Sequence, residues 1–167
     1  MFANGSVCEP LGRTFCVLRL DTRLSLQTGL FTKEKIMPEN ILERGFKNVH
    51  EGGKITGFEL LIKSSYYRGI ALSLIEDFEV TVDGESYGRD KIKFTTPDGA
   101  HTYTLDELQD VTTIRWPWQA PAKLTVSKPG GLKPGAHNVQ VVQKDRISYM
   151  PSNPQVRTYR KNVVLVA

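Results

Sequence analysis

The sequence predicts an all-β protein: an antiparallel β-sandwich, immunoglobulin-like or jelly-roll-like, with at most one short helix. Short segments of alternating apolar and polar residues recur roughly every ten residues, and Gly, Pro or Asp-Gly turn signals separate them. The 167 residues allow one domain of ordinary size, and 40% hydrophobic with 24% charged residues is sufficient for a packed core. These observations favour two antiparallel sheets packed face to face.

The first two expected strands are 41–49 and 54–63, joined by a turn at 51–53. Each strand contains a glycine. Gly45 interrupts the first, and Gly57 lies in the middle of the second. A glycine inside a strand indicates a bulge or the close approach of another backbone.

The stretch 64–85 ends one strand and starts another. Its loop, Tyr66-Tyr67-Arg68-Gly69, is unusual in composition because plain surface loops carry small polar residues. After the loop, 78–82 alternates apolar and polar residues and runs into Asp83-Gly84. This pattern predicts a half-buried strand that ends in a tight hairpin turn.

The segments after this hairpin continue the β pattern. We expect a strand at 91–95, a turn at 97–99 and an antiparallel return at 101–104. Thr104 and Glu107 have the spacing of a capping box, so 104–108 is the one helix expected. Pro- and Gly-rich connections at 128–135 and 151–154 separate the remaining strands, which are 123–127, 138–143 (which could run on to 149) and 158–166.

Residues 1–36 differ from the rest of the chain because they show little periodicity beyond 14–20. Lys33-Glu34 can be encoded by AAGGAG, a purine-rich ribosome-binding sequence, at the usual distance before Met37. Two interpretations stay open: a misassigned start, with Met37 as the native first residue, or an N-terminal arm that packs on a partner. The predicted domains are therefore an N-terminal extension, 1–36, and a single β-sandwich, 37–167.

Composition excludes several classes of protein. The net charge is +4, but Lys and Arg do not form the long runs of a nucleic-acid-binding segment. Cys8 and Cys16 lack the accompanying Cys and His spacing of a zinc site, and the three histidines are scattered. We expect no metal and no cofactor in this chain. No apolar run approaches the roughly 20 residues of a membrane helix, and no secretory signal is evident, so the expected location is cytoplasmic.

Catalytic motifs are also missing from the sequence. It contains no Gly-rich phosphate loop, no G-x-S-x-G and no His-Glu-x-x-His. Glu76 and Asp77 are adjacent, so in a strand they point to opposite faces and cannot form an acid–base pair. Glu107 is explained by helix capping. We therefore predict no catalytic residue in this chain.

Two aromatic clusters remain as candidate binding sites. The first is the 66–68 loop, and the second, 114–118, holds both tryptophans on either side of Pro117. Trp, Tyr and Arg dominate interface hot spots because they bury much area with few rotatable bonds. The alternative for the tryptophans is a plug at the end of the core. The candidates for a partner interface or a substrate wall are Tyr66, Tyr67, Arg68, Arg115, Trp116 and Trp118.

Several motifs, in order, resemble the small β subunits of bacterial C-glycoside deglycosidases. The resemblance extends from about Met37 to the C-terminus and does not cover residues 1–36. The segments that carry it are 48–49, 57–58, 66–69, 72–77, 82–84, 103–108, 115–117 and 128–132.

The resemblance implies a β-sandwich that assembles with a larger α subunit, a sugar-isomerase-like TIM barrel that holds a divalent metal, expected to be Mn²⁺. Such a complex cleaves the carbon–carbon bond between a sugar and an aromatic aglycone once the sugar 3-hydroxyl has been oxidised to a ketone. The β subunit would be inactive alone, and would order loops of the partner or wall off the aglycone end of the pocket.

Two other functions remain open at this point. One is a stand-alone carbohydrate-binding sandwich that uses Trp116 and Trp118 as a stacking platform. The other is a structural partner of a different sugar-isomerase-like enzyme. A carbohydrate-binding module of this kind is expected to be monomeric and secreted, whereas a subunit is expected to expose an apolar patch when it is isolated.

Overall fold

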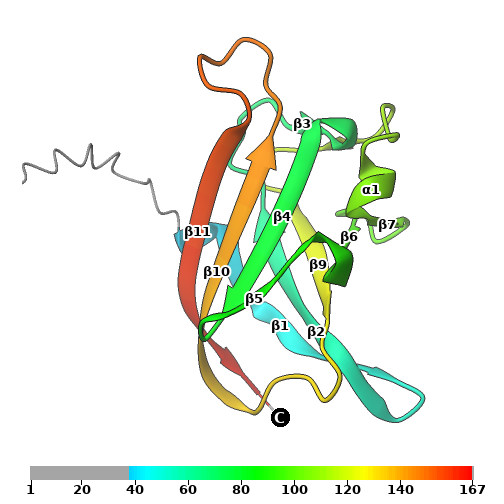
Figure 1. Ribbon diagram of the computed structural model, residues 1–167, viewed down its shortest axis with the longest axis vertical. Coiled ribbons are helices and arrows are strands. Elements are labelled where there is room, and N and C mark those ends of the chain that lie inside the picture. The colour runs from blue at the N-terminus through cyan, green and yellow to red at the C-terminus, as the bar shows by residue number, and fades with distance from the viewer. Residues whose placement is uncertain (1–37, 167) are drawn as a thin grey trace, which may run out of the picture. The chain divides into compact units, whose positions relative to one another are not determined.

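The computed structural model describes residues 38–166, which form an antiparallel β-sandwich (Figure 1). The five-stranded sheet has the order β1-β2-β9-β6-β7, and the four-stranded sheet has the order β11-β10-β4-β5. The first comprises β1 (Ile41–Glu51), β2 (Lys54–Lys63), β9 (Pro121–Ser127), β6 (Ile92–Thr95) and β7 (Thr102–Thr104). The second comprises β11 (Gln155–Leu165), β10 (Gly135–Asp145), β4 (Ile75–Val82) and β5 (Glu85–Tyr87). The predicted fold class is confirmed.

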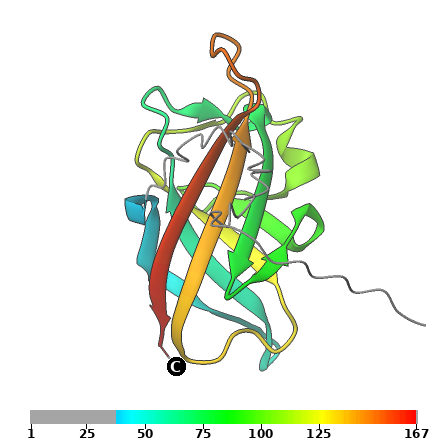
Figure 2. The same ribbon diagram turned by 60° about the vertical axis from the view of Figure 1, so that its left-hand side comes forward.

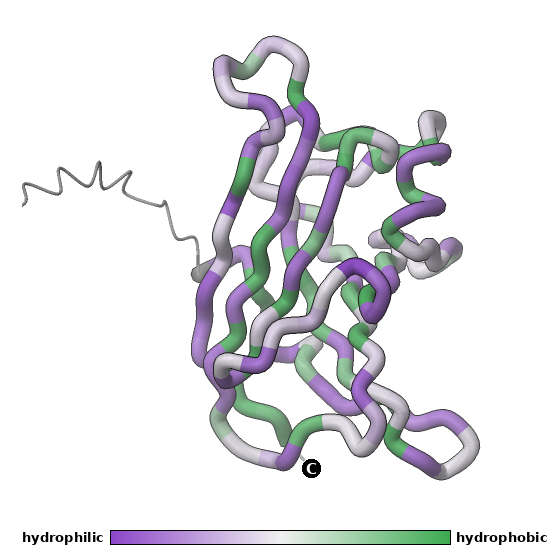
Figure 3. Tube along the Cα trace, in the orientation of Figure 1, coloured by the Kyte–Doolittle hydropathy of each residue, from purple (hydrophilic) through white to green (hydrophobic). Residues whose placement is uncertain are grey.

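The core lies between the two sheets and follows from the alternation of the strands. In β4, Phe78, Val80 and Val82 are buried while the residues between them are not. The Phe78 ring stacks on that of Phe94 in β6 of the opposite sheet, with 6.0 Å between ring centres. The same alternation of hydrophobic and hydrophilic residues is visible along the strands in Figure 3. Packing apolar faces in this way gives the dominant stabilising contribution.

Strand β2 has the predicted bounds, and the prediction of a close backbone approach at Gly57 is confirmed. A Cβ atom at Gly57 would lie 2.1 Å from the carbonyl oxygen of Val126 in β9. The first strand has an irregular register on either side of Gly45, because its pairing with β2 shifts between Leu42 and Lys47. The two glycines therefore let the sheet close where a side chain would separate the strands.

The hairpin turn between β4 and β5 is also confirmed. Asp83 and Gly84 have φ angles of 51° and 89°, and Val82 pairs with Glu85. Two positive φ angles in a two-residue loop are the requirement of a type I′ turn. Asp83 accepts a hydrogen bond from the His137 Nδ1–H at 2.6 Å, and the His137 Nε2–H donates to the Lys133 carbonyl at 2.7 Å. His137 thus ties the hairpin to the connection that precedes β10.

Helix α1 (Leu105–Leu108) is the one α-helix among residues 38–166. The predicted capping box is present: Glu107 N–H donates to the Thr104 hydroxyl, and Thr104 N–H donates to the Glu107 carboxylate. The sequence did not predict the two-stranded ladder of β3 (Ile70–Ala71) and β8 (Arg115–Trp116), nor strand β5. It also did not predict three short 3₁₀ turns, which are η1 (Pro38–Asn40), η2 (Leu72–Leu74) and η3 (Arg89–Lys91).

Several strand boundaries differ from the predicted ones, among them the start of β4, which lies at Ile75 instead of residue 78, and those of β10 and β11. Strand β10 begins at Gly135, inside the connection expected to be unpaired, and ends at Asp145 without extending to residue 149. Strand β11 begins at Gln155, three residues before the predicted start. Both strands lengthen because they pair with each other along all of their length, from Gly135 with Leu165 to Asp145 with Gln155. Tertiary pairing here overrides the local Pro and Gly signal.

The predictions for residues 1–36, including Cys8 and Cys16, lie outside the described residues. The described helices include none that combines the length and apolar character required to cross a bilayer.

Candidate partner-binding surface

Three loops meet at one end of the sandwich, which we call the loop end (Figures 1 and 2). They are the β2–β3 loop at 64–69, the β8–β9 loop at 117–120 and the β10–β11 loop at 146–154. The first two are joined by a hydrogen bond from Gln119 N–H to the Ser64 carbonyl, at 3.3 Å. The loop end thus brings together the two aromatic clusters that are about 50 residues apart in the sequence.

The β3–β8 ladder aligns these two clusters. Ile70 pairs with Trp116 and Ala71 with Arg115. The Arg115 guanidinium donates to the carbonyl oxygens of Gly69 at 3.0 Å and Arg68 at 3.3 Å. Gly69 has a φ of +65°, and a Cβ atom there would lie 2.8 Å from the Trp116 carbonyl oxygen. The turn therefore requires glycine, and it fixes Tyr67 and Arg68 beside the second cluster.

Exposed aromatic rings and an arginine dominate the loop end. Tyr67, Trp118 and Tyr149 expose 62%, 56% and 59% of their surface. The guanidinium carbon of Arg68 lies 5.2 Å from the ring centre of Tyr67 and 6.0 Å from that of Tyr149. Both distances fall within the range of a cation–π contact. We call Tyr67, Arg68, Arg115, Trp118 and Tyr149 the aromatic–arginine surface.

Trp116 does not belong to this surface. It is fully buried and packs against Phe94 and Phe78 at 5.3 Å and 6.4 Å between ring centres. Its indole N–H donates to the Ala120 carbonyl at 2.8 Å. Strand alternation explains the correction, because Arg115 points outward and Trp116 inward. Trp116 is the core plug that the sequence left open as the alternative, and it cannot serve as an exposed stacking platform.

Tyr66 is half-buried and lies between the exposed surface and the interior. Its ring makes an edge contact with Tyr67, with 5.4 Å between centres. It also lies 5.9 Å from the guanidinium carbon of Arg157 in β11. Of the six candidates from the sequence, the structure exposes Tyr67, Arg68, Arg115 and Trp118, half-buries Tyr66 and buries Trp116.

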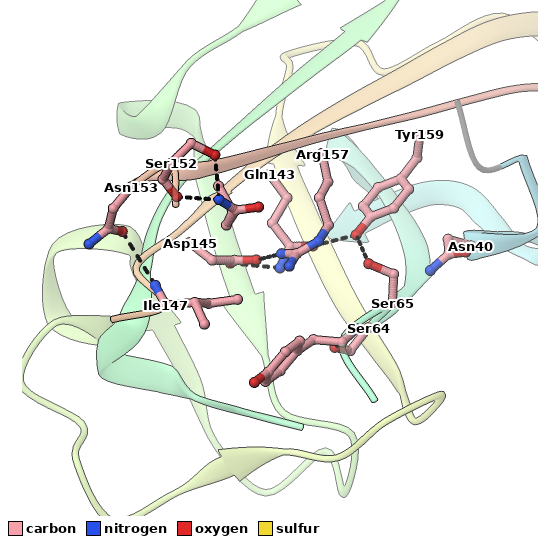
Figure 4. A network of polar contacts seen from close by, with 12 residues as sticks. Asn40, Ser64, Ser65, Gln143, Asp145, Ile147, Ser152, Asn153, Arg157 and Tyr159 are labelled. Atoms are coloured by element: carbon pink, nitrogen blue, oxygen red, sulfur yellow. Dashed lines mark hydrogen bonds and ion pairs between the residues drawn. The ribbon is translucent and has the colours of Figure 1, made fainter. Parts of the chain in front are cut away.

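A buried polar network lies beneath the loops (Figure 4). Asp145 at the end of β10 is fully buried and forms an ion pair with Arg157. The Gln143 amide donates to Asp145 at 2.8 Å, and the Tyr159 hydroxyl donates to the Gln143 carbonyl oxygen at 2.9 Å. The Ser65 hydroxyl lies 3.2 Å from the Tyr159 oxygen and completes the chain of contacts to the 64–69 loop. The network therefore connects strands β10 and β11 to the loop end.

Burial controls the ionisation of this network. Burial raises the pKa of Asp145 to about 6, against the opposing effects of the hydrogen bond from Gln143 and the charge of Arg157. Burial also raises the pKa of Tyr159 to about 12. The Asp145–Arg157 pair is thus an internal charge pair with nearly complete hydrogen bonding, and neither side chain is presented to solvent as a catalytic group would be.

Glu76 and Asp77 form ion pairs with basic residues rather than an acid–base pair with each other. Glu76 lies 2.7 Å from Arg146, and Asp77 is held by Arg89 and Lys144 at 3.7 Å and 3.2 Å. Within residues 38–166, no group of three or more His, Cys, Asp or Glu side chains is arranged to hold a metal ion. Glu76 and Asp77 thus have basic partners on neighbouring elements, and the exposed aromatic and arginine side chains remain the distinguishing feature of the loop end.

Two hollows in the described part of the chain lie away from the loop end. One, of about 700 Å³, is lined by residues of β1, β2 and the C-terminal strand together with Leu132 and Pro134. The other, of about 600 Å³, lies on the outer face of the five-stranded sheet and includes Glu59, Lys123 and Thr125. Neither contains a residue of the aromatic–arginine surface.

Comparison with known proteins decides the family. The family model described as C-glycoside deglycosidase beta subunit matches residues 37–149. The chain belongs to this family. It is 38% identical over 108 residues to the C-glycoside deglycosidase beta subunit of Eubacterium cellulosolvens, covering 64% of this chain and 72% of the relative. It is 36% identical over 97 residues to the 3'-dehydrocarminate deglycosidase beta subunit of a Microbacterium species, covering 58% of this chain and 70% of the relative.

Some of the family-like motifs have a purely structural explanation. The Asn48 amide donates to the Leu132 carbonyl at 2.9 Å, and its oxygen accepts from Leu132 N–H at 3.0 Å. Gly131, with a φ of +60°, leaves no room for a side chain against Asn48. These contacts hold the 128–132 turn on β1, at a site distinct from the loop end.

Proposed function

We propose that this chain is the β subunit of a heteromeric C-glycoside deglycosidase that cleaves the sugar–aglycone bond of a 3-oxo-C-glycoside by elimination. Family membership and the names of its relatives support the role of a subunit. The chemistry follows from the substrate. A ketone at C3 of the sugar acidifies the neighbouring C2–H, so that a base removes this proton and forms an enolate. As the enolate returns to the ketone, a C1–C2 double bond forms, the C1–aglycone bond breaks, and the aglycone carbon takes up a proton.

We propose that the catalytic centre belongs to a TIM-barrel, sugar-isomerase-like α subunit. The described residues of this chain do not fit a metal site, so no step of the reaction is assigned to a metal held here. A divalent metal in the α subunit, expected to be Mn²⁺, would stabilise an enolate oxygen as a Lewis acid. The β subunit would act as an accessory subunit of a carbon–carbon lyase and would be inactive without the α subunit. The complex would be located in the cytoplasm.

The observation that carries the role of this chain is the aromatic–arginine surface. Tyr67, Trp118 and Tyr149 are more than half exposed, although large aromatic residues are usually buried. Such residues, clustered with arginine on loops that a rigid sandwich positions, have the composition of an interface hot spot. We propose that this surface contacts the α subunit, orders its loops and closes the aglycone end of the substrate pocket.

Co-expression with a TIM-barrel partner tests the proposed function. A tagged copy of this chain is expected to copurify with the partner, and the pair is expected to release the aglycone from a 3-oxo-C-glycoside in the presence of Mn²⁺. Each subunit assayed alone, and the pair treated with a chelator, serve as controls. Full activity of the partner alone would contradict the proposal.

A stand-alone carbohydrate-binding module remains the second candidate, but with a stacking surface that differs from the predicted one. The two-tryptophan platform is excluded because Trp116 is buried. Trp118, Tyr67 and Tyr149 still offer exposed ring faces for stacking on sugars. Binding of the isolated chain to glycans without any partner would favour this function. Copurification with a TIM-barrel enzyme that acts on another substrate would instead indicate the structural-partner alternative.

A further inference from the structure

The arginines of the loop end fall into two groups. Arg146 is neutralised by Glu76, and Arg157 by Asp145. Arg68 and Arg115 form no ion pair with any residue of the part of the chain that the structure describes. Two guanidinium groups on an otherwise aromatic surface therefore carry uncompensated positive charge.

The Arg68 guanidinium is held in place without the use of its hydrogen-bond donors. It contacts the rings of Tyr67, in the 64–69 loop, and Tyr149, in the 146–154 loop. Within residues 38–166 its side chain donates no hydrogen bond to the protein. Stacking fixes a guanidinium by its faces and leaves its planar N–H groups for a bidentate acceptor. The guanidinium N–H groups of Arg68 therefore have no protein acceptor within residues 38–166.

Arg115 is only partly engaged. One of its terminal nitrogens donates to the carbonyl oxygens of Gly69 and Arg68, and no contact of its other two nitrogens within residues 38–166 is found. The same bonds anchor Arg115 directly beneath the backbone of Arg68. The two cations therefore lie on adjacent parts of one surface, and a protein that covers it must provide negative charge or leave both charges desolvated and unpaired, which is costly.

We infer that the aromatic–arginine surface docks a carboxylate-bearing patch of the partner protein, with Asp or Glu side chains that pair with Arg68 and Arg115 and an apolar rim that receives the tyrosines and Trp118. Charge complementarity is the argument for this occupant, and it agrees with the net charge of +4 of the whole chain. The inference rests on the proposed function, because it assigns the chemistry of the same surface.

The test measures association of this chain with its TIM-barrel partner at low and high salt, about 50 mM and about 500 mM NaCl, which differ strongly in screening. Arg68→Gln removes the charge. The matched control is Arg160→Gln, which removes an exposed arginine on β11 that hydrogen-bonds to Gln140. We expect Arg68→Gln to weaken association about tenfold or more at low salt and to reduce the salt dependence, whereas Arg160→Gln changes the affinity less than about twofold.

A second variant separates charge from stacking. Arg68→Lys keeps the positive charge but loses the planar fork, so we expect it to retain the salt dependence of the wild type while binding more weakly. Because Arg68 is exposed and makes no internal hydrogen bond, neither variant is expected to change the thermal midpoint of the isolated chain.

Failure of this inference and failure of the proposed function would give different results. If the wild-type pair assembles and releases aglycone, but Arg68→Gln binds as well as Arg160→Gln, the inference is wrong and the proposed function stands. Assembly that salt leaves unchanged would overturn it in the same way. If the wild-type chain does not bind the partner at either salt concentration, both the inference and the proposed function are overturned.

Discussion

At the scale of single residues, the loop end depends on side chains and backbone positions that tolerate little change. Gly69 fixes the turn that places Tyr67 and Arg68, and Asp145 supplies the buried charge beneath them. Neither residue would touch a partner directly. Variants of Gly69 and Asp145 therefore test how the sandwich positions the aromatic–arginine surface, and they leave the side chains that would contact a partner unchanged.

Replacement of Gly69 by Ala is expected to lower the free energy of unfolding by about 2–4 kcal/mol, since both the positive φ and a clash with the Trp116 carbonyl penalise the new side chain. Gly84→Ala is the matched control, because Gly84 has a φ of +89° but no atom within 4 Å of an added Cβ. Urea unfolding of both variants measures the difference. Equal losses at the two positions would show that the close contact at Gly69 contributes nothing.

The buried charge of Asp145 predicts a pH dependence of stability. The pKa of Asp145 is about 6 in the folded protein and near 3.8 in the unfolded chain, so between these values the folded state binds more protons. The free energy of unfolding is therefore expected to fall as pH rises from 4 to 7, by on the order of 3 kcal/mol from this group. Asp145→Asn is expected to lose this part of the slope in urea titrations at several pH values. If Asp145→Asn has the same pH dependence of the free energy of unfolding as the wild type, the raised pKa of Asp145 is not its cause.

At the scale of elements, the strands and turns were the most predictable features. Strand β2, the Asp83–Gly84 hairpin and the capping box of α1 all follow from local signals in the sequence. The β3–β8 ladder has only two residues in each strand, which is too short for a periodic pattern. Its formation depends on the tertiary approach of two loops, and the sequence therefore did not predict it.

The buried network was missed for a different reason. Gln143 and Asp145 continue the inward-facing positions of β10 that Val139 and Val141 begin. A polar residue at a core-facing position was the available signal, but its partners Arg157 and Tyr159 lie on another strand. The sequence did not predict Tyr149 because residues 146–154 contain no second aromatic residue that would mark a cluster. Only the fold brings Tyr149 close to Arg68.

The His137 contacts give a prediction for the hairpin element. Burial lowers the pKa of His137, but the hydrogen bonds to Asp83 and Lys133 outweigh it and leave the pKa above its usual value of 6.5. The stabilisation by His137 is thus complete below pH 6.5 and is lost as pH rises through the higher folded-state pKa. We expect His137→Gln to destabilise the protein more at pH 6 than at pH 9 in thermal unfolding. A difference that grows with pH would contradict this account.

At the scale of the whole molecule, we propose that the sandwich presents its loop end to a partner, above a buried polar network that connects strands β10 and β11 to that end. The fold class and the family followed from the sequence. The surface followed only in part, because Trp116 is buried by strand alternation in β8 and Tyr149 was not among the candidates. Both interpretations of residues 1–36, a misassigned start and a partner-binding arm, stay predictions. An intact mass of the native protein that starts at Met37 would support the misassigned start, and a mass that includes Met1 would end that interpretation.

The most direct test of the central claim is the affinity of the purified chain for the proposed α subunit when the exposed rings are removed. We expect the double variant Tyr67→Ala, Trp118→Ala to weaken association by about 100-fold or more, the effect of losing two hot-spot residues. Val164→Ala, which truncates a half-exposed side chain on β11, should bind as the wild type does. Wild-type affinity of the double variant, with its fold intact by circular dichroism, would show that the loop end is not the docking surface.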